Sequence, residues 1–127
     1  MNTTQEKADF KKEFKKRCFL FSLKILELSE DLKGNRTNWP LLDQVVRSGT
    51  SIGANVVEGG NSTSKREYIN YFNIALKSAS ETLYWLALIK ETNLKKMDKI
   101  EKIYNECEEL KRLLSTIILN TKSNSKI

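Results

Sequence analysis

The chain is 127 residues long and carries 22 Lys and Arg against 16 Asp and Glu, a formal net charge of +6. A chain of this length buries one hydrophobic core, so we expect residues 1–127 to form a single domain. Histidine is absent, which removes the usual general base and the commonest zinc ligand, so we expect no enzyme, no metal and no cofactor. The basic excess favours RNA, DNA or an acidic protein as a partner, and solvated charged faces on a soluble protein explain it equally well.

The cysteines and the hydropathy pattern bear on the compartment. Cys18 and Cys107 lie far apart and form no CxxC or metal-binding spacing, so we expect two reduced thiols in a core and a cytoplasmic protein. No apolar run approaches the roughly 20 residues that span a bilayer. The sequence therefore predicts no membrane segment.

From about residue 6 to residue 33, apolar residues recur every three or four positions, which predicts one long helix. This face comprises Phe10, Phe14, Cys18, Phe21, Ile25, Leu28 and Leu32. Phe19, Leu20, Leu23 and Leu26 add a second apolar stripe, and one bundle core cannot cover both. The second stripe predicts self-association, although a wide core face in a monomer would explain it almost as well.

The second predicted helix has clear signals at both ends. Asn38 as N-cap and Pro40 in the first turn predict its start, and Gly59-Gly60 predict its end. We therefore expect a helix over about residues 39–58.

Two more helices follow. Ser64 and Glu67 match a capping box, in which each side chain accepts from the other residue's amide, and predict a third helix over about residues 65–91. Apolar periodicity predicts a fourth helix over about residues 97–120, and we expect the polar tail 121–127 to be disordered. Because no segment alternates as a strand does, the sequence predicts an all-α, antiparallel up-down-up-down four-helix bundle.

The polar residues of the second helix recur at spacings of three, four and seven, so they share one side of it. They are Gln44, Arg47, Ser48, Ser51, Asn55 and Glu58. Ser78 and Glu81 on the third helix are natural partners, and Arg47 with Glu81 or Glu58 would form a charge-assisted pair. We favour a buried hydrogen-bonded network that fixes helix register over a binding or catalytic cluster.

Small residues in the same helix have a packing role. Gly49, Gly53 and Ala54 allow another helix to approach closely. Each glycine costs about 1 kcal/mol of helix stability relative to alanine, so packing must offset that cost. The Gly-Thr-Ser-Ile-Gly run lacks the pattern of a phosphate-binding loop and does not follow a strand.

Two basic runs are the candidates for nucleic-acid binding. The first, on the first helix, comprises Lys11, Lys12, Lys15, Lys16 and Arg17. The second, where the third helix meets the fourth, comprises Lys95, Lys96, Lys99 and Lys102. Alternating topology places them at opposite ends of one bundle, and an oligomer would repeat each as a ring. Phosphate contact and pairing with nearby acidic residues explain the runs equally well, and no RNA-binding aromatic motif accompanies either.

Two motifs in combination resemble a known family. The first runs Gln44-x-x-Arg47-Ser48-x-x-Ser51-Ile52-x-x-Asn55-Val56-x-Glu58-Gly59, and the second runs Tyr71-Phe72-x-Ile74-Ala75-x-x-Ser78-x-x-Glu81. Their order and separation resemble the bacterial four-helix-bundle family encoded in intervening sequences of 23S ribosomal RNA genes, and the similarity covers essentially the whole chain. The chain departs from that pattern at Val56-Val57, where the family often has Ile-Ala, and at Lys77, where it often has Gly.

The resemblance implies a four-helix bundle assembled as a ring-shaped homopentamer, with no established enzymatic activity. A weaker likeness, by fold and assembly, is to accessory proteins of diversity-generating retroelements, basic pentamers that bind a reverse transcriptase and nucleic acid. We therefore expect a non-enzymatic homo-oligomer that binds nucleic acid, with structured RNA favoured, through basic patches repeated by symmetry. The alternative is an interaction scaffold for a polymerase or other protein partner, and an enzyme built around Arg47, Asn55 and Glu58 is the least favoured hypothesis.

Overall fold

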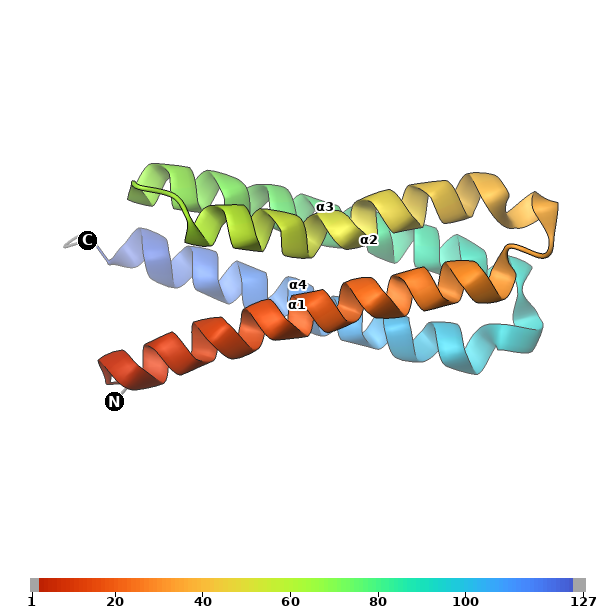
Figure 1. Ribbon diagram of the computed structural model, residues 1–127, viewed down its shortest axis with the longest axis horizontal. Coiled ribbons are helices and arrows are strands. Elements are labelled where there is room, and N and C mark those ends of the chain that lie inside the picture. The colour runs from red at the N-terminus through yellow and green to blue at the C-terminus, as the bar shows by residue number, and fades with distance from the viewer. Residues whose placement is uncertain (1–2, 125–127) are drawn as a thin grey trace.

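The computed structural model describes residues 3–124, and within them four long helices are joined by short turns (Figure 1). The helices are α1 (Thr4–Leu32), α2 (Trp39–Gly60), α3 (Lys65–Thr92) and α4 (Met97–Ser123), with 3₁₀ turns η1 (Arg36–Asn38) and η2 (Leu94–Lys96) before α2 and α4. No strand occurs in this part of the chain. The predicted all-α, up-down-up-down four-helix bundle is confirmed.

Side-chain caps fix the starts of α1 and α3. The Thr3 hydroxyl accepts from the Glu6 amide at 3.1 Å, and the Glu6 carboxylate accepts from the Thr3 amide at 2.6 Å, which closes a capping box. The Ser64 hydroxyl accepts from the Glu67 amide at 3.1 Å, as predicted. The return contact differs from the prediction, because the Glu67 carboxylate accepts from the Thr63 amide at 3.2 Å.

Asn38 precedes α2 but does not cap it with its side chain. Its amide nitrogen turns inward and donates to the Leu32 carbonyl at 2.9 Å and to the Asn93 side chain at 3.1 Å. The Asn93 amide donates back to the Asn38 side-chain oxygen at 3.0 Å. This amide pair ties the α1–α2 turn to the α3–α4 turn, while Pro40 lies in the first turn of α2 as predicted.

The helix bounds differ from the predicted ones mainly near the chain ends. The capping box starts α1 at Thr4, slightly earlier than predicted. Helix α4 continues to Ser123, so the first three residues of the predicted disordered tail 121–127 are helical. Burial of Ile118 one turn earlier helps to hold this end in place. Residues 125–127 lie outside the described part of the chain.

One apolar cluster, contributed by all four helices, forms the core. Helix α1 supplies six of the seven residues predicted for its core face: Phe14, Cys18, Phe21, Ile25, Leu28 and Leu32. Phe10, the seventh, is 47% exposed. Fully burying one such side chain contributes about 1.5–3 kcal/mol, so packing of these faces dominates the stability of the bundle.

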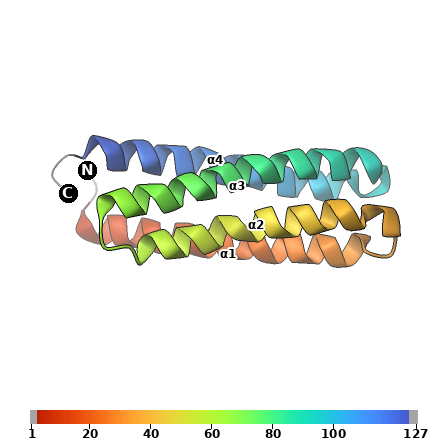
Figure 2. The same ribbon diagram turned by 90° about the horizontal axis from the view of Figure 1, so that it is seen from above.

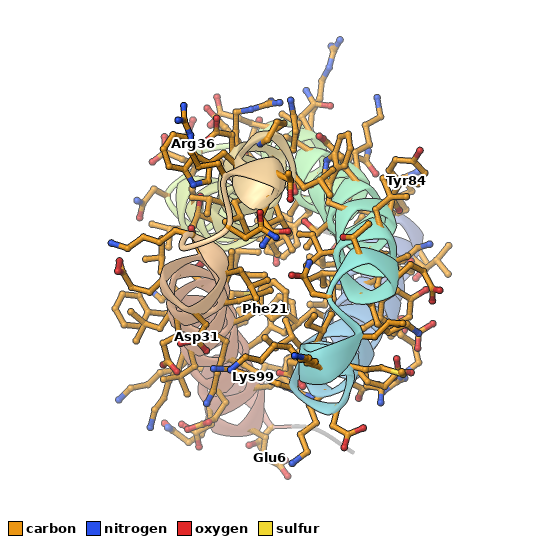
Figure 3. All side chains as sticks on the ribbon, turned by 90° about the vertical axis from the view of Figure 1, so that its right-hand side faces the viewer. Glu6, Phe21, Asp31, Arg36, Tyr84 and Lys99 are labelled. Atoms are coloured by element: carbon orange, nitrogen blue, oxygen red, sulfur yellow. The ribbon has the colours of Figure 1, made fainter. Side chains whose placement is uncertain are left out.

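The alternating helices give the bundle two distinct ends (Figures 1 and 2). The amino-terminal end holds the start of α1, the α2–α3 turn and the end of α4, and the loop end holds the α1–α2 and α3–α4 turns. Seen from the loop end, α1 and α3 occupy diagonal corners, with Phe21 near the centre and Tyr84 on the outside (Figure 3). Outward faces of α1 and α3 therefore point in different directions.

The two interior glycines of α2 face α1. A Cβ at Gly49 would lie 2.9 Å from Ile25 Cγ1, and one at Gly53 would lie 3.4 Å from Cys18 Cβ. Ala54, predicted to share this role, is exposed. The glycines thus allow α1 to approach α2 closely, while the polar side of α2 faces a different neighbour.

Candidate nucleic-acid interface

Hydroxyl groups join α2 to α3 along the polar side of α2. The Ser78 hydroxyl donates to the Ser51 hydroxyl at 3.0 Å, and the Asn55 amide donates to the same hydroxyl at 2.9 Å. One turn away, the hydroxyls of Thr82 and Ser48 are hydrogen-bonded at 2.9 Å, with Thr82 fully buried. Ser51, Asn55 and Ser78 were predicted in this network, whereas Thr82 was not. We call these contacts among Ser48, Ser51, Asn55, Ser78 and Thr82 the hydroxyl seam. The hydroxyl seam fixes the register of α2 and α3, as expected for a buried network whose hydrogen bonds are satisfied.

The charged members of the predicted network lie outside this seam. Arg47 is exposed and donates to the Gln44 side chain within α2, and Glu81 accepts from the Trp85 indole at 3.0 Å within α3. Glu58 is exposed and makes no hydrogen bond or ion pair with its side chain among residues 3–124. The predicted pairing of Arg47 with Glu81 or Glu58 is not formed there. Short hydroxyl side chains fill the close α2–α3 contact, which leaves the long charged side chains in water, where a charge costs least.

Lysines gather on the amino-terminal half of α1. Lys11, Lys12, Lys15 and Lys16 are exposed, and none belongs to an ion pair within residues 3–124. The Lys11 ammonium lies 5.8 Å from the ring centroid of Tyr68 on α3, a cation–π contact. The other three ammonium groups face water with no direct partner in the described chain.

Arg17, the last residue of this run, is ion-paired. Its guanidinium donates to both carboxylate oxygens of Glu106, at 2.7 and 2.9 Å. This hydrogen bonding raises the pKa of Arg17 above its ordinary value. The two-point contact joins α1 to α4, so we assign Arg17 to the bundle and not to a ligand.

Further basic residues share the amino-terminal end, and sequence reasoning missed them. Lys65 and Arg66 begin α3, and Lys122 lies in the last turn of α4. The Lys65 ammonium donates to the Asn124 carbonyl at 2.7 Å, which links the start of α3 to the end of α4. The predicted topology already implied this convergence, because the starts of α1 and α3 and the end of α4 must share one end.

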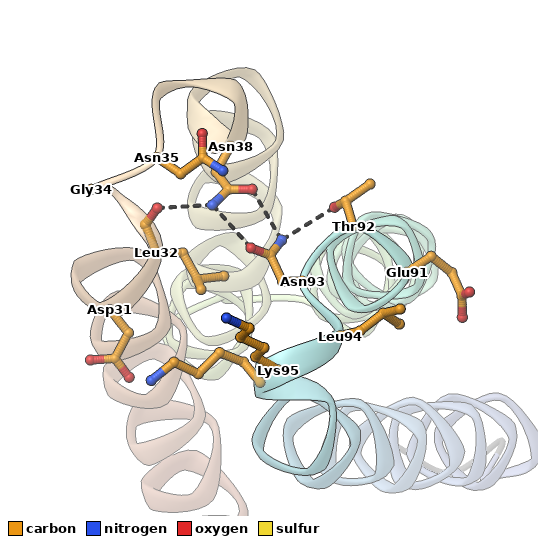
Figure 4. A pocket seen from close by; sticks show the side chains of 11 residues that line it. Asp31, Leu32, Gly34, Asn35, Asn38, Glu91, Thr92, Asn93, Leu94 and Lys95 are labelled. Atoms are coloured by element: carbon orange, nitrogen blue, oxygen red, sulfur yellow. Dashed lines mark hydrogen bonds between the residues drawn. The ribbon is translucent and has the colours of Figure 1, made fainter.

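The second basic run lies at the opposite, loop end of the bundle, beside a cavity of about 500 Å³ (Figure 4). Lys95 and Lys96 line the cavity together with Asp31 and the Asn38–Asn93 amide pair. Helices α1 and α3 both end here, and cations are favourable beside the carbonyl groups of a helix C-terminus. These lysines therefore have a structural role available within the chain.

Carboxylates balance several of the loop-end lysines. Lys99 on α4 forms an ion pair with Asp31 on α1, and the hydrogen bond from Lys99 lowers the pKa of Asp31. Lys90 pairs with Glu101 at 2.9 Å, which raises the pKa of that lysine. Lys102 is exposed and has no ion pair within residues 3–124. Within residues 3–124, four lysines of the α1 run lack an ion pair, against Lys95, Lys96 and Lys102 of the loop-end run, so the two runs differ by one unpaired charge.

Both cysteines of the chain lie in the core. Cys18 and Cys107 are free, buried thiols as predicted, and burial raises the pKa of each to about 12, so neither is a thiolate at neutral pH. Residues 3–124 contain no group of three acidic, cysteine or histidine side chains that could bind a metal. Over the same residues, no helix combines the length and apolar character required to cross a bilayer.

Comparison with known proteins shows which family the chain belongs to. Residues 11–116 match the family model of the 23S rRNA-intervening sequence protein. The crystal structure of a protein of unknown function from Bacteroides thetaiotaomicron, of the S23 ribosomal protein family, has 38% sequence identity and a TM-score of 0.78, covering 83% of this chain and 97% of that one. No curated protein matches the chain. The family match spans the hydroxyl seam and the basic run of α1, and the chain belongs to the 23S rRNA-intervening sequence protein family.

Proposed function

We propose that this protein is a non-enzymatic homo-oligomer that binds structured RNA through the lysines of its amino-terminal end. The observation that carries the proposal is the set of exposed ammonium groups on α1, of Lys12, Lys15 and Lys16, without an ion-pair partner among residues 3–124. Lysines that neutralise phosphates release condensed counterions, which gives affinity for any nucleic-acid backbone. The +6 net charge of the chain favours the same encounter.

The spacing of these lysines suits a phosphate backbone. Lys11 and Lys15 are four residues apart, as are Lys12 and Lys16, so they form two rows with a rise of about 6 Å per step along α1. Lys65 and the other basic residues at this end of the bundle extend the positive surface beyond α1. Recognition of this kind reads the shape and charge of a folded RNA and needs no contact with base edges.

Self-association would multiply the patch. The outer face of α1 exposes Phe19, Leu20, Leu23 and Leu26 to water, each between 42% and 63%. A ring of five copies, the number that the resemblance implies, would present five lysine patches to one RNA and raise its avidity. Light scattering at micromolar concentration tests this part, and a monomeric mass would contradict it.

Charge-removing variants at the two ends test the RNA site. One variant changes the amino-terminal lysines and a matched control changes three loop-end lysines: Lys12→Gln, Lys15→Gln and Lys16→Gln against Lys95→Gln, Lys96→Gln and Lys102→Gln. Binding of a structured 23S ribosomal RNA fragment is measured across a salt series. We expect the wild type to show a linear log–log salt dependence, and the amino-terminal variant to lose about 2–3 from the magnitude of that slope for three lost phosphate contacts.

The loop-end control should keep most of the affinity and slope of the wild type. Absent binding, binding that ignores salt, or equal losses in the two triple variants would each contradict the proposed RNA site. Comparison with a duplex DNA of equal length shows whether RNA is preferred.

A protein-interaction scaffold is the second candidate, and the exposed apolar face of α1 favours it. Its partner would be a polymerase or another protein that covers this face. Recovery of one protein at a fixed stoichiometry after nuclease treatment would support the scaffold, and loss of every partner on nuclease treatment would support RNA binding.

A further inference from the structure

We propose that a groove between α1 and α4 at the amino-terminal end binds one unpaired base of the RNA, with guanine preferred. The proposal rests on the proposed function and adds one contact with a base to the recognition of backbone charge. The groove is lined by Phe10, Glu13, Phe14, Arg17 and Leu113, and we call it the base groove.

The base groove lies where the first turns of α1 diverge from the last turns of α4 (Figure 1). Helical spacing places Phe10 on the core face of α1, together with Phe14 one turn later. Phe14 is buried, whereas Phe10 is 47% exposed and borders the groove. An aromatic ring of the core face is therefore open to a ligand at the end of the bundle that carries the α1 lysines.

The size of the base groove suits one planar ring system. Its volume is about 170 Å³. A cavity of about 150 Å³ is sufficient to bind benzene, and pockets for drug-sized ligands begin at about 300 Å³. The Phe10 and Phe14 rings are stacked, with 6.3 Å between their centroids, and Leu113 borders the groove from α4. Because every base has a flat face that stacks on an aromatic side chain, the groove suits a base whose sugar stays outside.

The polar groups at the base groove select the kind of base. The Arg17 guanidinium already donates to both carboxylate oxygens of Glu106, at 2.7 and 2.9 Å. The Glu13 carboxylate is exposed and forms no hydrogen bond or ion pair among residues 3–124. An ionised carboxylate only accepts hydrogen bonds, so it favours a ligand that offers N–H donors.

Guanine matches this carboxylate better than the other bases do. Its Watson–Crick edge presents two neighbouring N–H donors, which the two oxygens of Glu13 can accept together. Adenine and cytosine present one amino group beside an acceptor, and uracil presents one N–H between two acceptors. An acceptor set against a carboxylate oxygen is unfavourable, so Glu13 favours guanine.

The lysines of the proposed RNA site lie beside the base groove. Lys16 is three residues after Glu13 and shares its side of α1, and Lys12 lies one turn before Lys16. A base held at Glu13 would have its own phosphate near these ammonium groups. The same positive charges oppose a cationic peptide, which is the other kind of ligand that a carboxylate beside an apolar groove attracts.

Hairpin RNAs with identical stems test the base groove. One hairpin is fully paired, and the others carry a single unpaired G, A, C or U in the stem. We expect the wild type to bind the guanine hairpin about fivefold or more tightly than the paired one, because a stacked base adds to the affinity. Phe10→Leu keeps an apolar side chain without the ring and should lose this gain, whereas Phe10→Tyr should retain it.

Phe19→Leu is the matched control, because Phe19 is exposed on the same helix and lies outside the base groove. Its preference among the hairpins should equal that of the wild type. The salt slope of Phe10→Leu should also equal that of the wild type, because the substitution removes no phosphate contact. Circular dichroism verifies that each variant folds.

Glu13→Gln tests the choice of base. The substitution keeps the shape of the side chain and replaces one acceptor oxygen with an N–H donor. We expect the variant to lose the preference for guanine over adenine while it still binds every hairpin. Because the change also removes a negative charge, the ratio of the two affinities is compared within each protein.

Equal wild-type affinity for all hairpins, with a normal salt slope, would overturn the base groove and leave the proposed RNA site in place. An equal loss of preference in Phe10→Leu and Phe19→Leu would do the same. A guanine preference that survives Glu13→Gln would overturn the role of that carboxylate. Absence of binding to every hairpin would overturn both the proposed function and the base groove.

Discussion

At the scale of single residues, Gly49 shows how one absent Cβ sets the distance between two helices. A Cβ there would lie 2.9 Å from Ile25 Cγ1 and 3.2 Å from its Cγ2. Ile25 is fully buried and β-branched, so its side chain has little freedom to move away. At Gly53 the nearest atom would be Cys18 Cβ at 3.4 Å, which is ordinary contact.

The two glycines therefore predict opposite responses to alanine. We expect Gly49→Ala to lower the free energy of unfolding by about 1–2 kcal/mol, because overpacking outweighs the gain in helix propensity. Gly53→Ala should raise it by up to about 1 kcal/mol, because only the propensity changes. Urea unfolding of the two variants measures the difference, and equal stabilities would contradict the assigned α1–α2 contact.

Sequence spacing was sufficient to predict a close approach at these glycines, but not the identity of the neighbouring helix. The 3.6-residue period shows which residues share one face of a helix, but it does not show which other helix packs against that face. The predicted polar side of α2 was placed correctly for Ser51 and Asn55, which bond to one another and to Ser78. Arg47 and Glu58 share its spacing and lie outside, because side-chain length and charge decide which members of a stripe can enter a close contact.

At the scale of helix pairs, the hydrogen-bonded hydroxyls between α2 and α3 form a network that fixes helix register, and not a cluster on the surface. Thr82 is fully buried and bonds to Ser48 across α2 and α3. Thr82→Val keeps the shape and leaves the Ser48 hydroxyl without this partner, so we expect a loss of about 1–3 kcal/mol in the free energy of unfolding. Arg47→Ala removes an exposed side chain and should change stability by less than about 0.5 kcal/mol.

A double-mutant cycle isolates the seam interaction. Ser48→Ala and Thr82→Val, measured singly and together by urea unfolding, should show a coupling energy of about 0.5–3 kcal/mol. Strict additivity would mean that the two hydroxyls do not support one another. Thr82 could have been found from the sequence, since it lies four residues after Ser78 and so on the same side of α3.

At the scale of the whole molecule, topology predicts more than composition does. Alternating helices already imply that the start of α1 shares an end with the start of α3, and that the two basic runs lie apart. The sequence alone could not show which Lys and Arg side chains form ion pairs. Arg17 pairs with Glu106, and Lys99 pairs with Asp31, across the α1–α4 contact. Those pairs depend on the relative heights of helices that are distant in the chain.

The Asp31–Lys99 ion pair makes the free energy of unfolding of the bundle depend on pH. The hydrogen bond from Lys99 holds the pKa of Asp31 below its ordinary value of about 3.9. Because the folded pKa is the lower one, the unfolded chain takes up the proton first. The stabilisation is therefore complete above the unfolded pKa and is lost as the pH falls through the folded one.

Asp31→Asn should consequently be less stable than the wild type at neutral pH, and the two stability curves should converge below about pH 4. The pair is partly exposed, so the difference should be modest and should shrink in about 1 M salt, where the Debye length falls to about 3 Å. Asp43→Asn is the matched control, because Asp43 is exposed and has no ion pair within residues 3–124. Urea unfolding across a pH series measures all three proteins. A deficit in Asp31→Asn that persists unchanged in strong acid would show that the loss comes from packing or helix propensity and not from the ion pair.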